Sequence, residues 1–551
     1  MSRSARINRR DALKLGLLGS AALALPFQRT ALTAADDDIN DRIATSLLPK
    51  PYTRPFATPP VLQPIKQDAT TDYYQMWQMA KDVEIIPGKP TTIYGYNGIT
   101  PGPTIVAQRG RPVVMQQINA LPQRHEGWDY TPWTSTHLHG SASLPEYDGY
   151  ASDVTKPGQW KNYKYPNFQD ARTLWYHDHG VHHTAENAYM GLAGMYIMHD
   201  SAERALNLPR GAYDVPLILK DAMFHRTGRL LADTNSDSGI YGDVIMVNGV
   251  PWPFMQVERR KYRFRVLNAC ISRSYRLRLN TGDALTMIGT DGGLMPSPVD
   301  VVNFRIAPGE RYEFVIDFAK YPIGTRLLLN NVSPPNNIDE VNTNRVMAFD
   351  VARDATSLDG NSVPAVLNTN QEVMGLTAAN AVRTRTMKFQ RSPDPLNPPT
   401  ATDDNEIWTV NAHSWQTIVD SGYTDAIARP REGEVEVWRF VNSSSGWFHP
   451  VHVHLVDYKI LSRNGAKPFP YERGPKDVVY LGEGETVDVV MRFTGQRGKY
   501  MIHCHNLIHE DHDMMTQFEV LPAIGAVGAS ATRGHDPILT DPAQDLPAPP
   551  L

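Results

Sequence analysis

The sequence predicts an all-β protein built from three related β-sandwich domains. Alternating or β-branched runs recur along the chain, as at 214–219, 312–317 and 486–491, whereas long helical periodicity is scarce. Pro (43) and Gly (39) are plentiful, which suits many short strands joined by turns. A length of 551 residues is too great for one compact core and fits two to four domains.

One pattern occurs three times and predicts the domain count. Each copy has a turn signal, then a strand-like run of period two that ends in asparagine. The copies are Asn97-Gly98 with the run 112–119, Asn248-Gly249 with 261–268, and Asn411-Ala412 with 434–442. Their spacing is the length of one β-sandwich. We therefore expect domains at 36–205, 206–355 and 385–523, a linker at 356–384 and a flexible tail at 524–551.

The first 35 residues resemble an export signal. Asn8-Arg9-Arg10-Asp11-Ala12-Leu13-Lys14 looks like a twin-arginine motif, and small residues at 31–35 offer a cleavage site. The apolar run 15–25 between them is too short to span a bilayer, and no later segment is typical of a membrane span. We expect export through the twin-arginine route to the periplasm or outside the cell. The alternative is a basic tail with no role in export.

Charge and cysteine content exclude several classes of protein. The net charge is −5 and no basic patch stands out, so we expect no nucleic-acid partner. Two cysteines, Cys270 and Cys504, are too few to staple an exported chain of this size with disulfides. Cys270 is expected to be a small buried apolar residue. We expect a monomer.

Ten of the eighteen histidines lie in four tight clusters. The clusters are His137-Leu-His139, His177-Asp-His179, His449-Pro-Val-His-Val-His454 and His503-Cys-His-Asn-Leu-Ile-His509. Residues two apart in a strand point to the same face, so each His-x-His pair presents two imidazoles together. Eight converging imidazoles exceed the needs of one metal ion and suit a cluster of several. Imidazole favours copper, zinc, iron or nickel, and ligand type alone leaves a zinc cluster open.

Cys504 predicts a second, separate metal site. It lies between His503 and His505, so in a strand its side chain faces the opposite way. A cysteine thiolate with two histidines and a weak axial methionine is the blue-copper ligand set, which His509, Met514 and His449 would complete. A kink at Pro450 would let His449 turn away from His452 and His454. Electrons could then pass between the two sites through the bonds that join Cys504 to its neighbours.

The chain resembles the multicopper oxidases from about residue 60 to 523. The resemblance is carried by Leu174-Trp-Tyr-His-Asp-His179, Thr184-Ala-Glu-Asn-Ala-Tyr189, His449-Pro-Val-His-Val-His-Leu-Val-Asp457 and His503-Cys-His-Asn-Leu-Ile-His-Glu-Asp-His-Asp-Met-Met515. These segments look closest to the branch of bilirubin oxidases and spore-coat laccases. The resemblance implies three cupredoxin-like Greek-key domains, with a trinuclear site between the first and the third.

The resemblance also implies four coppers and their ligands. The type 1 copper would take His449, Cys504, His509 and axial Met514. The type 2 copper would take His137 and His452. The type 3 pair would take His139, His177, His179, His454, His503 and His505. The other histidines, at 125, 182, 183, 199, 225, 413, 512 and 535, are expected at the surface or behind the ligands.

Three further residues match functional positions of the family. Asp148 and Glu510 resemble its proton suppliers for cleavage of the oxygen–oxygen bond, and Trp447 resembles a tryptophan at the substrate edge of the type 1 site. The alternatives are ordinary surface or turn carboxylates and a packing aromatic. Four protons are needed for each dioxygen, and carboxylates are reasonable carriers.

The expected function is oxidation of bilirubin, phenols or similar small organic donors, one electron at a time, coupled to reduction of dioxygen to water. One alternative is a metallo-oxidase acting on Cu(I) or Mn(II), although the 19 methionines are dispersed. A copper nitrite reductase has two domains and lacks the type 3 ligands. A non-catalytic copper-binding protein is the remaining alternative, although every ligand position here is filled.

Overall fold

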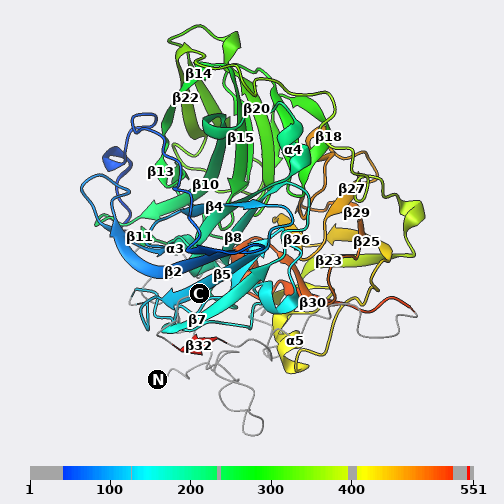
Figure 1. Ribbon diagram of the computed structural model, residues 1–551. Coiled ribbons are helices and arrows are strands. Elements are labelled where there is room, and N and C mark those ends of the chain that lie inside the picture. The colour runs from blue at the N-terminus through cyan, green and yellow to red at the C-terminus, as the bar shows by residue number, and fades with distance from the viewer. Residues whose placement is uncertain (1–40, 126, 233–237, 395–405, 525–542, 546–551) are drawn as a thin grey trace, which may run out of the picture.

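The computed structural model describes residues 41–125, 127–232, 238–394, 406–524 and 543–545. The expected signal peptide (1–35) and His535 lie outside the described residues, as does most of the expected tail. Within the described chain, six β-sheets form three pairs along the sequence. In Figure 1 the second pair (green) lies above, and the first (blue to cyan) and third (yellow to orange) lie below it.

The first sandwich pairs a six-stranded with a four-stranded sheet. The larger sheet contains β1 (Lys66–Gln67), β2 (Asp72–Val83), β3 (Thr91–Tyr96), β5 (Val113–Ala120), β7 (Gln159–Tyr165) and β32 (Gln544–Asp545). The smaller contains β4 (Gly102–Gln108), β6 (Thr136–His139), β8 (Arg172–Asp178) and β9 (Ala193–His199). Part of the expected tail thus forms an edge strand, because β32 pairs with β7.

The second sandwich pairs an eight-stranded with a five-stranded sheet. The larger contains β10 (Asp214–Phe224), β11 (Leu230–Leu231), β12 (Val244–Val247), β13 (Val250–Pro251), β15 (Lys261–Asn268), β17 (Leu285–Thr290), β18 (Gly293–Val301) and β20 (Arg311–Asp317). The smaller contains β14 (Phe254–Arg259), β16 (Tyr275–Leu279), β19 (Phe304–Ile306), β21 (Arg326–Asn331) and β22 (Arg345–Asp354). Phe264 and Phe314 of one sheet share a core with Phe349 of the other.

The third sandwich pairs a five-stranded with a four-stranded sheet. The first contains β23 (Arg383–Pro393), β24 (Glu406–Val410), β25 (Val435–Asn442), β27 (Tyr458–Arg463) and β29 (Thr486–Arg492). The second contains β26 (His449–Val453), β28 (Val478–Leu481), β30 (Gly498–Cys504) and β31 (Met515–Val520). Trp438 and Phe440 pack with Val451 and Val479 between these sheets.

Helices are short and lie in the connections. The α-helices are α3 (Thr184–Met190), α4 (Ser201–Ala205), α5 (Trp415–Asp420) and α6 (Leu507–Asp511). The 3-10 turns are η2 (Thr45–Leu47), η3 (Pro145–Tyr147), η4 (Gly211–Tyr213), η5 (Phe318–Lys320), η6 (Ala378–Asn380) and η7 (Pro470–Glu472). Among the described residues, no helix is both long and apolar enough to cross a membrane.

The threefold sequence pattern has a common structural cause. Asn97, Asn248 and Asn411 all adopt positive φ. Each side chain accepts a backbone N–H from an earlier strand of the same sheet: Trp77 in β2, Ile218 in β10 and Lys388 in β23. The run after each turn forms β5, β15 or β25, and each pairs in parallel with β2, β10 or β23. The repeat confirms the all-β fold class. The exact domain boundaries stay a prediction.

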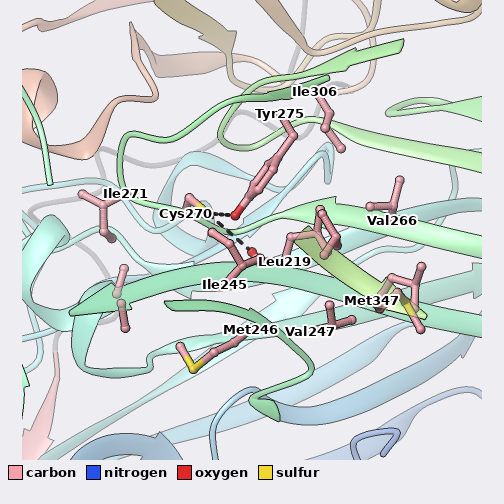
Figure 2. Packing of buried hydrophobic residues seen from close by; sticks show 14 of the residues in the cluster. Leu219, Ile245, Met246, Val247, Val266, Cys270, Ile271, Tyr275, Ile306 and Met347 are labelled. Atoms are coloured by element: carbon pink, nitrogen blue, oxygen red, sulfur yellow. Dashed lines mark hydrogen bonds between the residues drawn. The ribbon is translucent and has the colours of Figure 1, made fainter. Parts of the chain in front are cut away.

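Cys270 lies in the core of the second sandwich, as expected. It is 2% exposed and packs among Leu219, Val266 and Ile271 (Figure 2). Its Sγ lies 3.2 Å from the hydroxyl of Tyr275. Cys270 and Cys504 are both free and buried, which agrees with the expectation that disulfides do not hold this chain together.

Candidate metal centre

Four strands of the first and third sandwiches bring the clustered histidines together. β6 pairs with β8 so that His137 faces His177, and β26 pairs with β30 so that His452 faces His503. The two strand pairs meet face to face. The ring of His137 stacks on that of His454 with centroids 4.0 Å apart, and the ring of His139 stacks on that of His452 at 3.7 Å. Neither sandwich alone contains the site.

One group of three imidazoles points its Nε2 atoms at a common point. Nε2 of His503 lies 3.3 Å from Nε2 of His179 and 3.2 Å from Nε2 of His454. Their nearest ring nitrogens all fall within 4.8 Å of one another. A shared proton can join two imidazole nitrogens at this distance, but a metal ion can bind all three lone pairs at once, so the arrangement fits a metal ion.

The remaining cluster histidines leave ring nitrogens without hydrogen-bond partners in the described structure. These atoms are Nε2 of His137, His177 and His452, Nδ1 of His139, and both ring nitrogens of His505. All belong to residues at most 1% exposed. Buried polar atoms without partners are rare in folded proteins, so their concentration at one place fits bound metal. His137, His139 and His177 form a second group within 4.8 Å, and His137, His452 and His454 a third.

Hydrogen bonds on the far side of the rings set their orientation. Nδ1 donates to an oxygen in five of the histidines: His137 to Asp148 O (2.5 Å), His177 to Asp178 O (2.8 Å), His452 to Asp477 O (2.9 Å), His503 to Cys504 O (3.2 Å) and His454 to Asp148 Oδ2 (2.7 Å). A ring that donates from Nδ1 keeps Nε2 free of a proton and available to a metal.

A separate group lies on the other face of β30. Nδ1 of His449 is 3.3 Å from Sγ of Cys504, Nδ1 of His509 is 3.6 Å from the same sulfur, and the two Nδ1 atoms are 3.2 Å apart. Met514 is fully buried in the same cluster and is tied to it through its backbone, which bonds to Cys504 and His509. This is the donor set of a blue-copper site.

The sequence-based reason for the orientation of His449 was wrong. Pro450 lies inside β26 and pairs with Tyr480 of β28 in unbroken register, so the strand has no kink there. His449 and His452 are three residues apart, and an odd spacing in a regular strand places two side chains on opposite faces. The alternation of the strand therefore separates the two metal groups without help from the proline.

Burial keeps the ligands in the protonation state that metals require, with one exception. It lowers the pKa of His449 and His177 to about 3 and that of His179 to about 4, so these imidazoles are neutral at neutral pH. The exception is Cys504, because burial raises the pKa of its thiol well above the usual value. Without a cation this thiol stays protonated, so binding of metal must release its proton.

The two predicted proton carriers are buried and oppositely tuned. Asp148 and Glu510 are each 2% exposed, which excludes ordinary surface carboxylates. Burial raises the pKa of Asp148 well above its usual value, and its Oδ1 has no hydrogen-bond partner in the described structure. Burial alone would also raise the pKa of Glu510, but the imidazoles of His179 and His503 lower it to about 2. Asp148 thus holds its proton more tightly than an exposed aspartate, whereas Glu510 is ionised at neutral pH.

Trp447 is half-buried beside the blue-copper group. Its ring meets that of Trp408 edge to face, with centroids 5.1 Å apart. Trp408 is nearly fully buried and stacks on His509 at 4.2 Å. Trp447 thus lies one aromatic ring away from a predicted ligand. Its assignment to the substrate edge stays a prediction.

Sequence reasoning missed several residues that support the predicted ligands. Ser444 Oγ lies 2.6 Å from Nε2 of His449, and the backbone N–H of Asn506 donates to Sγ of Cys504 at 3.4 Å. Trp175 stacks on His177 at 4.1 Å. Of these residues, only Trp175 could have been found from the sequence. It lies two residues before His177 in β8, so the two side chains share a face of the strand.

Asp477 is the most important residue that sequence reasoning missed, because it contacts predicted ligands of the first and the third sandwich. Its Oδ1 lies 3.1 Å from Nε2 of His139 and its backbone oxygen accepts a hydrogen bond from His452. Burial raises the pKa of Asp477 to about 6 against the opposing charge of Arg311, so its carboxylate is ionised at neutral pH.

Seven of the eight remaining histidines are among the described residues, and all seven lie outside these groups. His183 and His225 are buried, whereas His125, His182, His199, His413 and His512 are partly exposed. None of these seven belongs to a group of ring nitrogens, thiols and carboxylates close enough to share a metal ion.

Comparison with known proteins agrees with this geometry. Three models described as multicopper oxidase match residues 79–203, 186–351 and 390–523. The chain is 38% identical to a bilirubin oxidase from Albifimbria verrucaria, over 92% of this chain and 90% of that protein. It is 33% identical to a laccase from Bacillus stratosphericus, over 84% of this chain and 98% of that one. A crystal structure of a multi-copper oxidase from Pediococcus acidilactici superposes with a TM-score of 0.74 at 26% identity, over 88% and 94% of the two chains.

Proposed function

This chain belongs to the multicopper oxidase family, and from that premise we propose that it oxidises small organic donors such as bilirubin or phenols and reduces dioxygen to water. The observation that carries the proposal is the continuity of the two ligand groups. Cys504 of the blue-copper group lies between His503 and His505, which belong to the histidine cluster. One three-residue segment therefore joins a single-metal site to a site with room for several.

The donor atoms support four coppers. His449, Cys504, His509 and Met514 would hold a type 1 copper, and His137 and His452 a type 2 copper. His179, His454 and His503 would hold one type 3 copper, and His139, His177 and His505 the other. The converging and unpartnered nitrogens support this division. When bound, copper supplies one-electron uptake at the single site and four-electron reduction of dioxygen at the cluster.

The protein supplies the path between these sites. From Sγ of Cys504 an electron can follow covalent bonds through the backbone into the imidazole of either neighbour. The backbone amide of Asn506 points at the same sulfur and stabilises negative charge on it. β30 is paired on both sides, by β26 and β31, which holds the side chains of His503 and Cys504 on opposite faces of the sheet.

Protons enter through the two carboxyl groups that flank the cluster. Each dioxygen takes four electrons from four one-electron oxidations and four protons, and yields two water molecules. Asp148 would release a proton from Oδ1, the oxygen without a hydrogen-bond partner, while Oδ2 stays bonded to Nδ1 of His454. Glu510, ionised and 2.9 Å from Nδ1 of His503, would accept a proton and pass it inward.

The donor would bind where the blue-copper group approaches the surface. Trp447 is partly exposed and leads through Trp408 to the ring of His509. Such an edge can accept an electron from any donor of suitable potential, which supports a broad range of small organic donors. We also propose that the chain acts as a monomer after export by the twin-arginine route to the periplasm or beyond. The motif at 8–14 supports the export route.

Oxygen uptake by the copper-loaded protein tests the proposed function. Bilirubin, a simple phenol, Cu(I) and Mn(II) are compared as donors at equal concentration, and peroxide is measured at the end. We expect uptake with bilirubin or the phenol and no peroxide. Uptake with Cu(I) or Mn(II) alone would assign the chain to the metallo-oxidases instead. A fully loaded protein that consumes no oxygen with any donor would identify a copper-binding protein without catalysis.

A further inference from the structure

His139 differs from the other histidines of the cluster in the ring atom that its surroundings hold. Five of them donate from Nδ1 to a neighbouring oxygen, as described above. In His139 it is Nε2 that lies 3.1 Å from an oxygen, Oδ1 of Asp477, and Nδ1 has no partner in the described structure. Its orientation toward the cluster is therefore reversed.

A buried arginine fixes the carboxylate of Asp477. Arg311 donates from Nη1 to Oδ1 and from Nη2 to Oδ2 of Asp477, each at 2.6 Å. Its Nε donates to the backbone oxygen of Thr173 at 3.0 Å, which fixes the guanidinium against β8. Both side chains are at most 2% exposed. In a bidentate, charge-assisted ion pair of this kind, the carboxylate has little freedom to rotate.

The pair joins all three sandwiches at the cluster. Arg311 begins β20 of the second sandwich, Asp477 directly precedes β28 of the third, and His139 ends β6 of the first. Gly140, which follows His139, packs directly on the pair: a Cβ there would lie 2.6 Å from Nη2 of Arg311 and 2.9 Å from Oδ2 of Asp477. The second sandwich therefore reaches the metal cluster although it provides none of the predicted ligands.

We propose that Asp477 and Arg311 are a positioning pair that holds His139 with its proton on Nε2, so that Nδ1 of His139 faces the metal. This inference rests on the proposed copper cluster. A carboxylate that receives two guanidinium hydrogen bonds has no proton to donate, so toward His139 it can only accept. The imidazole must then carry its proton on Nε2, which leaves the lone pair on Nδ1.

Replacing Asp477 by asparagine should weaken this preference with almost no change in shape. The amide has one oxygen where the carboxylate has two and it carries no charge, so the donors of Arg311 and His139 compete for a single acceptor, and the NH2 group faces Nε2 of His139 in one of its two orientations. That NH2 group can only donate, and it would favour the ring form with the proton on Nδ1. A protonated Nδ1 cannot bind copper. We expect weaker copper binding at the cluster, by about 10–100-fold.

A matched control separates positioning from general stability. Arg463 and Glu472 form a similar buried pair in the third sandwich, at 2.8 Å and 2.5 Å, and Glu472 contacts none of the predicted ligands. Glu472→Gln breaks that pair as Asp477→Asn breaks the other. Both variants should lose thermal stability in the copper-free state.

The readouts are copper content after dialysis against a chelator and the electron paramagnetic resonance spectrum of the loaded protein. For Asp477→Asn we expect the blue absorption to remain and the copper content to fall. Two coupled type 3 coppers give no resonance signal, so the share of copper that the spectrum detects should rise when one of them is lost. Glu472→Gln should match the parent in both. A parental spectrum and copper content for Asp477→Asn would overturn the proposal, as would equal losses in Glu472→Gln.

Two further measurements keep the outcome decisive. If Asp477→Asn does not fold, Arg311→Lys keeps the charge but removes the two-pronged contact. It should show the same spectral change more weakly, and a parental spectrum would overturn the proposal. Oxygen uptake by the parent is measured in parallel. A parent that loads copper but consumes no oxygen contradicts the proposed function, while the spectra of the variants still decide the role of the pair.

Discussion

Replacing Gly309 by alanine should displace His505 from the metal cluster. Gly309 lies in the turn between β19 and β20, with φ at +84°, and its amide bonds to the oxygen of Asn268. A Cβ at this position would lie 2.8 Å from Cδ2, 3.0 Å from Cγ and 3.1 Å from Nε2 of His505. Carbon atoms in contact normally lie about 3.5–4.0 Å apart, so the ring or the turn must move by roughly 0.5–1 Å.

The substitution therefore has two separable costs. A side chain in the left-handed region costs about 1–2 kcal/mol of folding stability. In a domain of this size that lowers the unfolding temperature by roughly 2–8 °C. The clash adds a loss of function, because a misplacement on the order of 1 Å in a reacting site can lower the rate about 100-fold.

Gly324→Ala is the matched control. Gly324 belongs to the same sandwich and has φ at +91°, but nothing lies within 4 Å of its added Cβ. Both variants should show similar losses of unfolding temperature without copper. Only Gly309→Ala should lose oxygen uptake, by about 10–100-fold, while the blue absorption of the Cys504 site remains. Parental oxygen uptake and copper content in Gly309→Ala would refute the reasoning, as would equal losses in the control.

Four other substitutions give further tests. Cys504→Ser should abolish both the blue absorption and turnover, because the thiolate is the single sulfur anion of its ligand group; a retained blue band would contradict the assignment. Met514→Leu should keep colour and activity but raise the reduction potential measured by redox titration, whereas loss of the copper would argue against an axial role. Asp148→Asn should keep the blue absorption and slow reoxidation of the reduced enzyme by oxygen about 100–10,000-fold, since an amide cannot release a proton; a change of less than about twofold would exclude Asp148 as a proton source. Burial raises the pKa of Asp243 from 3.8 to about 6, against the nearby charge of Arg42. The folded protein binds this proton more tightly than the unfolded chain, so stability falls as the pH rises from about 4 to 6, by on the order of 3 kcal/mol. Asp243→Asn should therefore unfold at a higher temperature than the parent above pH 6 and show no gain near pH 4; the same difference at both pH values would contradict this.

Local backbone geometry made much of this site predictable from the sequence. The two-residue period of a strand was enough to predict that His137 and His139 act together and that Cys504 faces away from its neighbours. The recurring turns at Asn97, Asn248 and Asn411 predicted three related domains, because each turn needs a residue that tolerates positive φ. These features depend on residues only a few positions apart.

Contacts between distant segments could not be predicted in this way. His137 meets His454 across the boundary of two sandwiches, and Asp477 reaches His139 over a separation of 338 residues. Trp408 stacks on His509 although nothing in its own segment indicates a metal site. Even the orientation of His449 came from the register of β26 and not from the proline beside it.

The sequence by itself determined the kinds of ligand and which of them share a strand face, because both follow from residue type and the period of the backbone. Only the tertiary structure decided which faces meet, which ring nitrogen of each histidine is held, and which charged groups lie behind the ligands. Those choices depend on the packing of three sandwiches against one another, and no local pattern in the chain encodes the contacts between them.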